Sequence, residues 1–388
     1  MARLDSLLFS TSWGFISTFL IFNLGFILAL KMGFYFKCSV KRAVFIYIWH
    51  SLFSIFYLFY VINNGGDALV YYDNSFNQAE FGVGTKGVVF LTSFLTQWIK
   101  LPLIGCFLVF HFFGFVGLLA FDASLRWGVK NKGKGVQSLA SLIVFLPSVS
   151  FWSSAIGKDS ISFMAVGLAL WASLQLNKRI TLMIFSIILM LFVRPHMAGL
   201  MVMGLAVSFI FQKNIPFIHR LFLGTTSLVV VAILVPFALS YAGVGEKVDA
   251  EMLGDYIDKR QSYNTEGGGG VDLSSMTFPM QLFTYMFRPL PFEAHSIASL
   301  MASLDNMVLL YLCIVGSYCL IKTRLTSEYK LHNRAFMWFY LMSSWSVLSM
   351  TSANLGIAMR QKWMIAPMLI FLLLSVIGNE NSRSNYEN

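Results

Sequence analysis

The stretch PSVSFWSSAIGKDS, residues 147–160, places a lysine and an aspartate between two apolar runs, residues 137–155 and 160–177. Each run has about the length that crosses the hydrocarbon core of a bilayer as a helix. A charge near membrane depth costs roughly 3 kcal/mol, so Lys158 and Asp159 are expected to have partners or a function there. The alternative is a tight turn whose two charges lie among lipid headgroups.

The rest of the chain has the composition of a membrane protein. Of its 388 residues, 57% are hydrophobic and 12% are charged, which excludes a water-soluble domain of this size. Apolar windows of about 20 residues predict one all-α, polytopic integral membrane domain, 1–388, with about 11 transmembrane helices. The predicted spans are residues 12–33, 43–62, 101–121, 137–155, 160–177, 180–193, 196–211, 221–241, 298–321, 335–356 and 363–378.

Basic residues gather in every second loop between these spans. The positive-inside rule therefore predicts an N-terminus outside and a C-terminus inside the cell. The net charge is +10, but the basic residues occur in small groups between the spans and not in one basic patch, so no nucleic-acid partner is expected. The basic loop residues are Lys37, Lys41, Arg42, Arg126, Lys130, Lys132, Lys134, Lys178, Arg179, Lys213, Arg220, Lys322, Arg324, Lys330 and Arg334.

The break at Arg194-Pro195 leaves one alternative open. We predict a hairpin of two short spans, 180–193 and 196–211. Proline also kinks membrane helices without ending them. A single kinked helix over 180–211 would place every later basic loop outside.

Metal and cofactor chemistry are not expected. The four cysteines, Cys38, Cys106, Cys313 and Cys319, lack metal-ligand spacing and lie in or beside predicted spans, so we predict neither a disulfide nor a zinc site. No P-loop, nucleotide-binding glycine fingerprint, zinc-protease motif or nucleophile elbow occurs in the sequence. ATP-driven transport and zinc proteolysis are therefore disfavoured.

Two predicted outer segments are long. Residues 63–100 begin with a Gly-Gly-Asp turn at Asp67 and end in an apolar stretch that is too short to span, expected as an interfacial or re-entrant helix. Residues 242–296 are charged at first and are then broken by four glycines, 267–270, which we expect to form a flexible hinge. The amphipathic stretch after them leads Arg288 back to the membrane.

Four polar patches share the outer side in this topology: Lys158-Asp159, Arg194-Pro195-His196, Arg288 to His295, and Met359 to Lys362. Arginine binds phosphate oxygens in a bidentate manner. We therefore expect Arg194, Arg288 and Arg360 to bind an anionic headgroup, above all a polyprenyl diphosphate, and Lys158, Lys362 and His196 to assist. For each arginine the alternative is interfacial anchoring.

The same side carries candidates for a general base that deprotonates a sugar hydroxyl. They are Asp67, Asp159, Glu293 and His295. Tyr71 and Tyr72, which follow Asp67, form a candidate sugar-stacking platform. Asp305, two turns into the span 298–321, is expected either to pair with an arginine of the bundle or to mark a later start of the span.

These features resemble the Wzy/EpsG-type polysaccharide polymerases of bacterial O-antigen, capsule and exopolysaccharide clusters. The architecture carries the resemblance along the whole chain. The local motifs are Gly66-Asp67-x-x-x-Tyr71-Tyr72, Phe151 to Asp159, Arg194-Pro195-His196 and Asn354-x-Gly356-x-x-x-Arg360. The Arg-x10-Gly signature of some members is absent, since Gly204 lies one residue too close to Arg194.

The resemblance implies transfer of a growing glycan from undecaprenyl diphosphate to an incoming lipid-linked repeat unit, on the outer face of the bacterial inner membrane and without a cofactor. It implies that the 242–296 segment gates the two chains, and that a flippase and a chain-length regulator are partners. Two alternatives stay open. One is a GT-C-like glycosyltransferase that uses a polyprenyl-phosphate sugar, whose acidic residue in the first outer loop matches Asp67 or Asp73. The other is a lipid-linked glycan flippase or another transporter, which should carry charges near its span midpoints.

Overall fold

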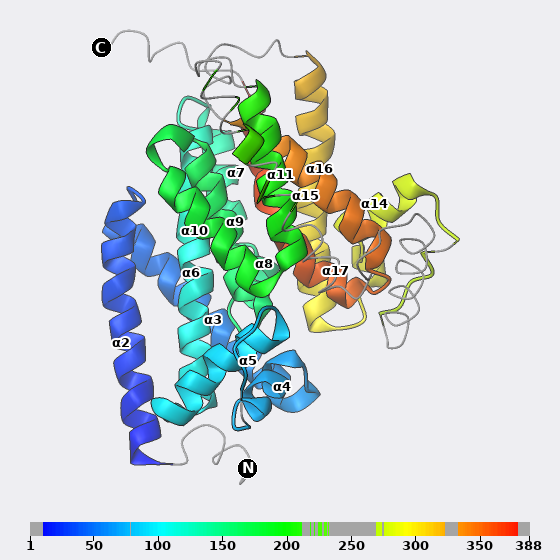
Figure 1. Ribbon diagram of the computed structural model, residues 1–388. Helices are drawn as coiled ribbons and strands as arrows, with labels where there is room; N and C mark the ends of the chain where they lie inside the picture. Colours follow the sequence, from blue (N-terminus) through cyan, green and yellow to red (C-terminus); the bar gives the residue numbers. More distant parts are fainter. Residues whose placement is uncertain are drawn as a thin grey trace. The chain divides into compact units, whose positions relative to one another are not determined.

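The computed structural model describes residues 11–77, 79–211, 269–273, 275–322 and 333–378, with a few separate residues between 218 and 232. Within these ranges the chain is helical (Figure 1) and forms no strand; an isolated β-bridge joins Gly270 and Asn354. The all-α prediction is confirmed. The predicted span 221–241 and most of the second outer segment lie outside the described residues.

Five stretches of the described chain are long and apolar enough to cross a membrane, which makes this a multi-pass membrane protein. They are α2 (Ser12–Tyr35), α3 (Val40–Asn64), α6 (Leu103–Gly128), the segment Lys134–Trp152 with α7 (Lys134–Ile143) and α8 (Pro147–Trp152), and α15 (Ile297–Lys322). A sixth is a broken span in which Leu355–Met364 and Ala366–Leu374 meet at 59°.

Several predicted spans correspond to helices that are not by themselves long and apolar enough to count as spans. These are α9 (Lys158–Ser173), α10 (Ile180–Val193), α11 (Pro195–Phe211) and α16 (Arg334–Thr351). The bent pair α17 (Leu355–Gln361) and α18 (Ala366–Leu374) follows α16 in the chain. The described residues thus give five spans, or six with the broken pair, where hydropathy windows predict about 11. Helices α10 and α11 match the bounds of their predicted spans closely, but they are too short to count as spans on their own.

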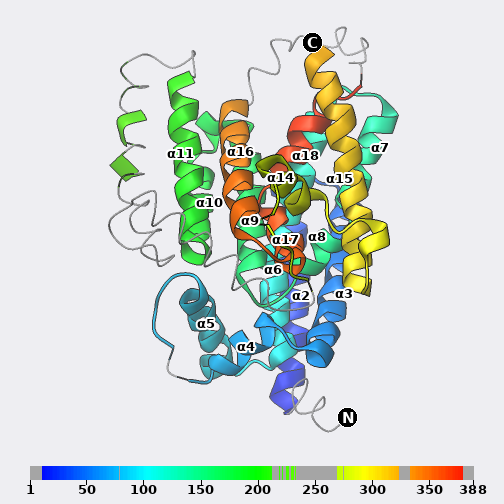
Figure 2. The same cartoon turned by 90° about the vertical axis from the view of Figure 1, so that its right-hand side faces the viewer.

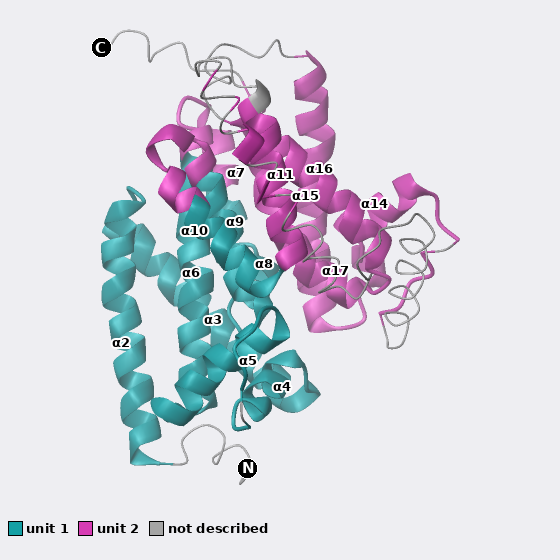
Figure 3. Ribbon diagram, viewed as in Figure 1, with its two compact units in different colours: residues 1–126, 141–171, 184–194 teal, residues 127–140, 172–183, 195–388 magenta. Residues whose placement is uncertain are grey.

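The chain forms two compact units (Figure 3). Unit 1 takes residues 1–126, 141–171 and 184–194, and unit 2 takes residues 127–140, 172–183 and 195–388. In unit 1, α3 packs against α2 and α8, and the first outer segment folds as α4 (Asp67–Asn74), α5 (Thr85–Ser93) and a π-helical turn, Phe94–Trp98. A helix therefore forms in the second half of the 63–100 segment, as the apolar stretch there predicts.

Glycines let the backbones of unit 1 approach closely. A Cβ atom on Gly114 of α6 would lie 1.9 Å from the carbonyl oxygen of Ser153, and one on Gly167 of α9 would lie 2.4 Å from that of Gly117. Neither position has room for a side chain. Close backbone packing at small residues is a main source of helix association in membranes, where the hydrophobic effect between helices is weak.

Unit 2 is built around α16. Helix α11 runs beside α16 (Figure 2), and α14 (Phe278–Phe287) crosses it. The indole Nε1 of Trp345 on α16 donates to the carbonyl of Leu282 on α14 at 3.0 Å. Helix α15 meets α18 at Gly316, where a Cβ atom would lie 2.7 Å from the Cβ atom of Leu373. These contacts fix α14 and α15, and three of the candidate site residues of unit 2, Arg288, Glu293 and His295, lie in the segment between these helices.

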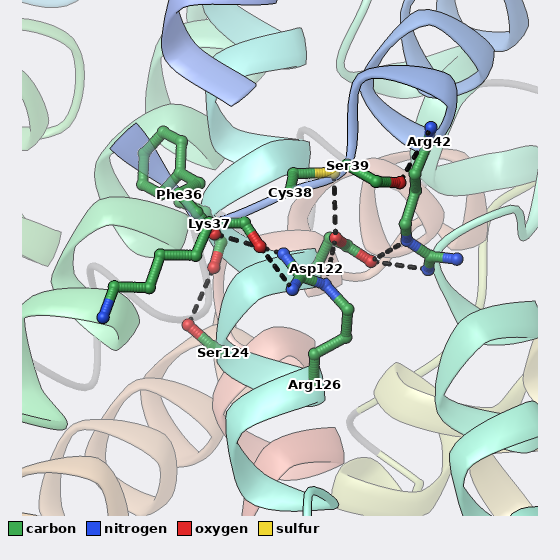
Figure 4. A network of polar contacts seen from close by, with 9 residues as sticks. Phe36, Lys37, Cys38, Ser39, Arg42, Asp122, Ser124 and Arg126 are labelled. Atoms are coloured by element: carbon green, nitrogen blue, oxygen red, sulfur yellow. Dashed lines mark hydrogen bonds and ion pairs between the residues drawn. The ribbon is translucent and has the colours of Figure 1, made fainter. Parts of the chain in front are cut away.

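A buried carboxylate ties together three helices of unit 1 (Figure 4). Asp122 on α6 has no exposed surface and accepts hydrogen bonds from Arg42 of α3, at 2.6 and 2.9 Å, and from Arg126, at 2.8 Å. Arg126 also donates to the carbonyls of Phe36 and Lys37, which follow the C-terminus of α2. Asp122 thus fixes the α2–α3 turn to the end of α6.

Replacing Asp122 by asparagine should destabilise the protein measurably. The change leaves two arginines without their common carboxylate, and breaking such a pair, here with partly exposed arginines, costs about 2 kcal/mol. The matched control is Glu80→Gln, because the Glu80–Lys86 pair is largely exposed and is worth little. Thermal unfolding in detergent should show a lower midpoint for Asp122→Asn and an unchanged one for Glu80→Gln; equal midpoints would contradict the role of Asp122.

Candidate functional site

The structure divides the predicted site residues evenly between the two units. Unit 1 holds Asp67, Tyr71, Tyr72, Lys158, Asp159 and Arg194, and unit 2 holds His196, Arg288, Glu293, His295, Arg360 and Lys362. In each unit, one predicted arginine is paired with one predicted carboxylate. The two pairs differ in their geometry.

In unit 1, Arg194 donates through Nη2 to Oδ1 of Asp159 at 2.6 Å. The two side chains are 9% and 15% exposed, so the pair is largely shielded from water. Arg194 follows the last residue of α10, and Asp159 lies in the first turn of α9. A carboxylate is favoured at a helix N-terminus and a cation at a C-terminus, so each charge suits its place.

The Nε–H group of Arg194 is buried, and no described residue offers it a hydrogen-bond acceptor. A buried donor without an acceptor costs about 1–3 kcal/mol. An anion that reached this guanidinium would satisfy Nε and Nη together, as carboxylates and phosphates do in bidentate contacts. Arg194 therefore has a hydrogen-bond donor, Nε–H, that is available to a bound anion.

The first outer segment lies against this pair. A Cβ atom on Gly157, directly before Lys158, would lie 3.7 Å from Cε2 of Tyr71. The amide of Gly84, which caps the N-terminus of α5, donates to the carbonyl of Phe192 at 2.8 Å, two residues before Arg194. Tyr71 of α4 and the N-cap of α5 thus lie against Gly157 and Phe192, which are each two residues from a member of the Asp159–Arg194 pair, and Lys158 is half-buried.

The remaining unit 1 predictions have mixed outcomes. Asp67 is exposed and is the first residue of α4, not part of an irregular turn. Tyr71 and Tyr72 are buried among their neighbours, so their rings do not present an open stacking platform. Burial raises the pKa of the Tyr72 phenol to about 12. These two tyrosines shape the surroundings of Gly157 in this structure.

In unit 2, Arg288 and Glu293 form a two-pronged pair. Arg288 Nη2 donates to Oε1 of Glu293 at 2.6 Å, and Nε lies 2.9 and 3.1 Å from its two oxygens. The backbone amide of Leu290 donates to the same carboxylate at 2.8 Å. Prolines 289 and 291 restrict the backbone between the partners. The pair is therefore a fixed clip within one short segment.

A buried network of polar side chains contacts the backbone of this clip. Asn306 on α15 donates to the carbonyl of Pro289 at 2.9 Å and accepts from the ammonium of Lys362. Asp305, Asn306 and Lys362 have no exposed surface, and Asp305 interacts electrostatically with Lys362. The charge that acts on Asp305 here is therefore that of a lysine, where an arginine was the expected partner. The ammonium of Lys362 lies inside unit 2, with no surface open to a headgroup.

The other unit 2 candidates are His196, His295 and Arg360. His196 is the second residue of α11 and is half-buried, and His295 is exposed. Arg360 is half-buried in the last turn of α17. The N-terminus of that helix is capped by Asn354, and residues 269–271, in the middle of the 242–296 segment, hydrogen-bond to residues 353–355. Glycines 269 and 270 of the predicted hinge are therefore held in place at this helix end.

Sequence reasoning missed Asn306 and Asp122. The available signal was a polar residue within an apolar run, which needs a partner inside the membrane. Among the described residues, no group of three His, Cys, Asp or Glu side chains is arranged to hold a metal ion. The chemistry of the two pairs is that of guanidinium groups for anion binding and carboxylates for proton transfer.

No protein-family model, no curated protein and no solved structure matches this chain.

Glu293 should titrate below its ordinary pKa of 4.5, because the hydrogen bond from Arg288 favours its charged form. A lowered folded-state pKa contributes stability above the ordinary value, and this contribution is lost as the pH falls through the lowered value. The clip should therefore loosen only in acid, below about pH 4.5. Carbon-13 NMR of labelled glutamate carboxyls, assigned with Glu293→Gln, measures the titration.

Arg288→Gln supplies the matched comparison. The titration midpoint of the Glu293 carboxyl should rise toward pH 4.5 when the arginine is lost. A midpoint that stays the same in this variant would show that Arg288 does not stabilise the carboxylate.

Proposed function

We propose that this protein is a membrane polymerase that joins undecaprenyl-diphosphate-linked repeat units into a surface polysaccharide. The observation that supports the proposal most is the presence of one arginine–carboxylate pair in each compact unit of a multi-pass membrane protein. A polymerase handles two lipid diphosphates, a donor and an acceptor. Two arginine sites match that requirement.

The proposed topology has about 11 spans, with the N-terminus outside and the C-terminus inside. This topology rests on the alternation of basic loops. It places Lys158, Asp159, Arg194, Arg288 and Arg360 at the outer face of a bacterial inner membrane. In the same proposal, a flippase supplies the substrate and a chain-length regulator limits the product.

The proposed reaction needs neither a nucleotide nor a metal. The acceptor hydroxyl loses its proton to a carboxylate and attacks the anomeric carbon of the donor glycan. A new C–O bond forms as the bond between that carbon and the diphosphate oxygen breaks, and the electron pair leaves with undecaprenyl diphosphate. Fixed guanidinium charge beside the leaving group, from Arg194 or Arg288, stabilises the negative charge that develops there.

A transporter is the second candidate, and one observation favours it. Asp305, Asn306 and Lys362 are buried where the broken span α17–α18 meets α15. Broken helices and buried charges are typical of transport sites. The GT-C-like glycosyltransferase has weaker support, namely that Asp67 is exposed in the first outer segment.

Deleting the gene and complementing it with variants separates these functions in the host. Arg194→Gln and Arg288→Gln should each reduce the long-chain polysaccharide by at least about tenfold, since an Arg–phosphate contact is a strong charge-assisted bond. A complete single repeat unit should accumulate on the lipid, measured by gel and mass spectrometry. Arg179→Gln, in a predicted cytoplasmic loop, is the matched control and should restore the ladder.

The other outcomes distinguish the alternatives. A repeat unit that is short by one sugar would make the protein a glycosyltransferase. Full repeat units that stay on the cytoplasmic side would make it a flippase, and an unaltered glycan pool would contradict both enzyme functions.

A further inference from the structure

We infer that Asp159 occupies the phosphate position on Arg194 in the unliganded protein, and that a lipid-linked diphosphate displaces it and frees it to act as the general base. The inference rests on the proposed function, because it assumes a diphosphate substrate. It assigns the base among four candidates. It also gives the two arginine–carboxylate pairs different roles: Asp159 exchanges with the substrate, and Glu293 stays on Arg288.

The first support is the incomplete use of Arg194. Among the described residues, Arg194 Nη2 donates to a single oxygen of Asp159, while the buried Nε–H has no acceptor. We would expect a permanent carboxylate partner to accept hydrogen bonds from both Nε and Nη2 of this guanidinium, as in bidentate pairs. A phosphate group with several oxygens can satisfy Nε and Nη2 at once.

The second support is the contrast with unit 2. Glu293 meets Arg288 through both oxygens, accepts from the amide of Leu290, and lies five residues from its partner in a segment restricted by prolines. Asp159 and Arg194 lie 35 residues apart, and Arg194 meets only one oxygen of Asp159, through Nη2, rather than both oxygens through Nε and Nη2. The Glu293 pair is a fixed clip, whereas the Asp159 pair is exchangeable.

The third support is the position that Asp159 would keep after release. It lies in the first turn of α9, where the helix dipole stabilises a carboxylate, beside the half-buried Lys158. The carboxylate can therefore remain charged when Arg194 turns to the phosphate. A charged carboxylate next to the bound diphosphate is the form that accepts a proton.

The resulting step is balanced. Diphosphate oxygens replace Asp159 on Arg194, and the acceptor hydroxyl transfers its proton to the released carboxylate as its oxygen bonds to the anomeric carbon. The bond from that carbon to the diphosphate breaks, and its electron pair goes to the departing undecaprenyl diphosphate. A later proton transfer to water restores Asp159, which returns to Arg194 when the lipid leaves.

The test measures binding of undecaprenyl diphosphate to the purified full-length protein in detergent, by native mass spectrometry. Asp159→Asn should bind about tenfold more tightly than the wild type, because a charged competitor for Arg194 is removed, yet it should lose polymerisation. Arg194→Gln should lose the binding. Glu293→Gln should bind more weakly, because it releases the clip that orients Arg288.

An infrared difference measurement uses wild-type protein and does not depend on the folding of a variant. Adding undecaprenyl diphosphate should shift an aspartate carboxylate band, identified by carbon-13 labelling of aspartate, and leave the labelled glutamate bands in place. Binding without any aspartate shift, or Asp159→Asn affinity equal to or below that of the wild type, would overturn the exchange and leave the proposed function intact. Absence of binding to the wild type would overturn both.

Discussion

The structure depends on one constraint, which is that a charge inside apolar helices must have a partner. Asp122 has two arginines, Lys362 has Asn306 and Asp305, and Arg194 has Asp159. Removing one member of such a set leaves a buried charge that costs several kcal/mol, more than the set itself contributes. The polar side chains therefore determine which helices meet, although they are a small part of the chain.

The same constraint separates structural from functional groups. The Asp122 cluster uses its donors on one carboxylate and on the carbonyls after α2, and it holds a turn. The chain from Lys362 through Asn306 to Pro289 supports the Arg288 clip. At Arg194 a buried donor is left over. Unused hydrogen-bonding capacity in a buried guanidinium is the feature that points to a ligand.

Much of the fold follows from composition and periodicity. The all-α membrane character is confirmed, the predicted span 180–193 coincides with α10, and the span 43–62 lies within α3. The number of spans does not follow from apolar windows alone, because several predicted spans, such as 180–193 and 196–211, correspond to helices of 14 and 17 residues that are shorter than the roughly 20 residues needed to cross the bilayer.

The candidate site was predictable in its residues and not in its contacts. Lys158, Asp159, Arg194 and Arg288 stand out because they are charged within an apolar sequence. The Arg288–Glu293 pair is local, but the Arg194–Asp159 pair depends on packing between segments 35 residues apart, which a single sequence does not reveal. The burial of Tyr71 and Tyr72 and the use of Asn306 as a bridge likewise arise from tertiary contacts.

The most direct test of the polymerase is reconstitution of the purified protein in liposomes with lipid-linked repeat units extracted from the deletion strain. The account predicts longer lipid-linked glycans, with one undecaprenyl diphosphate released for each bond formed and no requirement for nucleotide or metal. Repeat units that cross the bilayer without growing longer would contradict it and would identify a transporter.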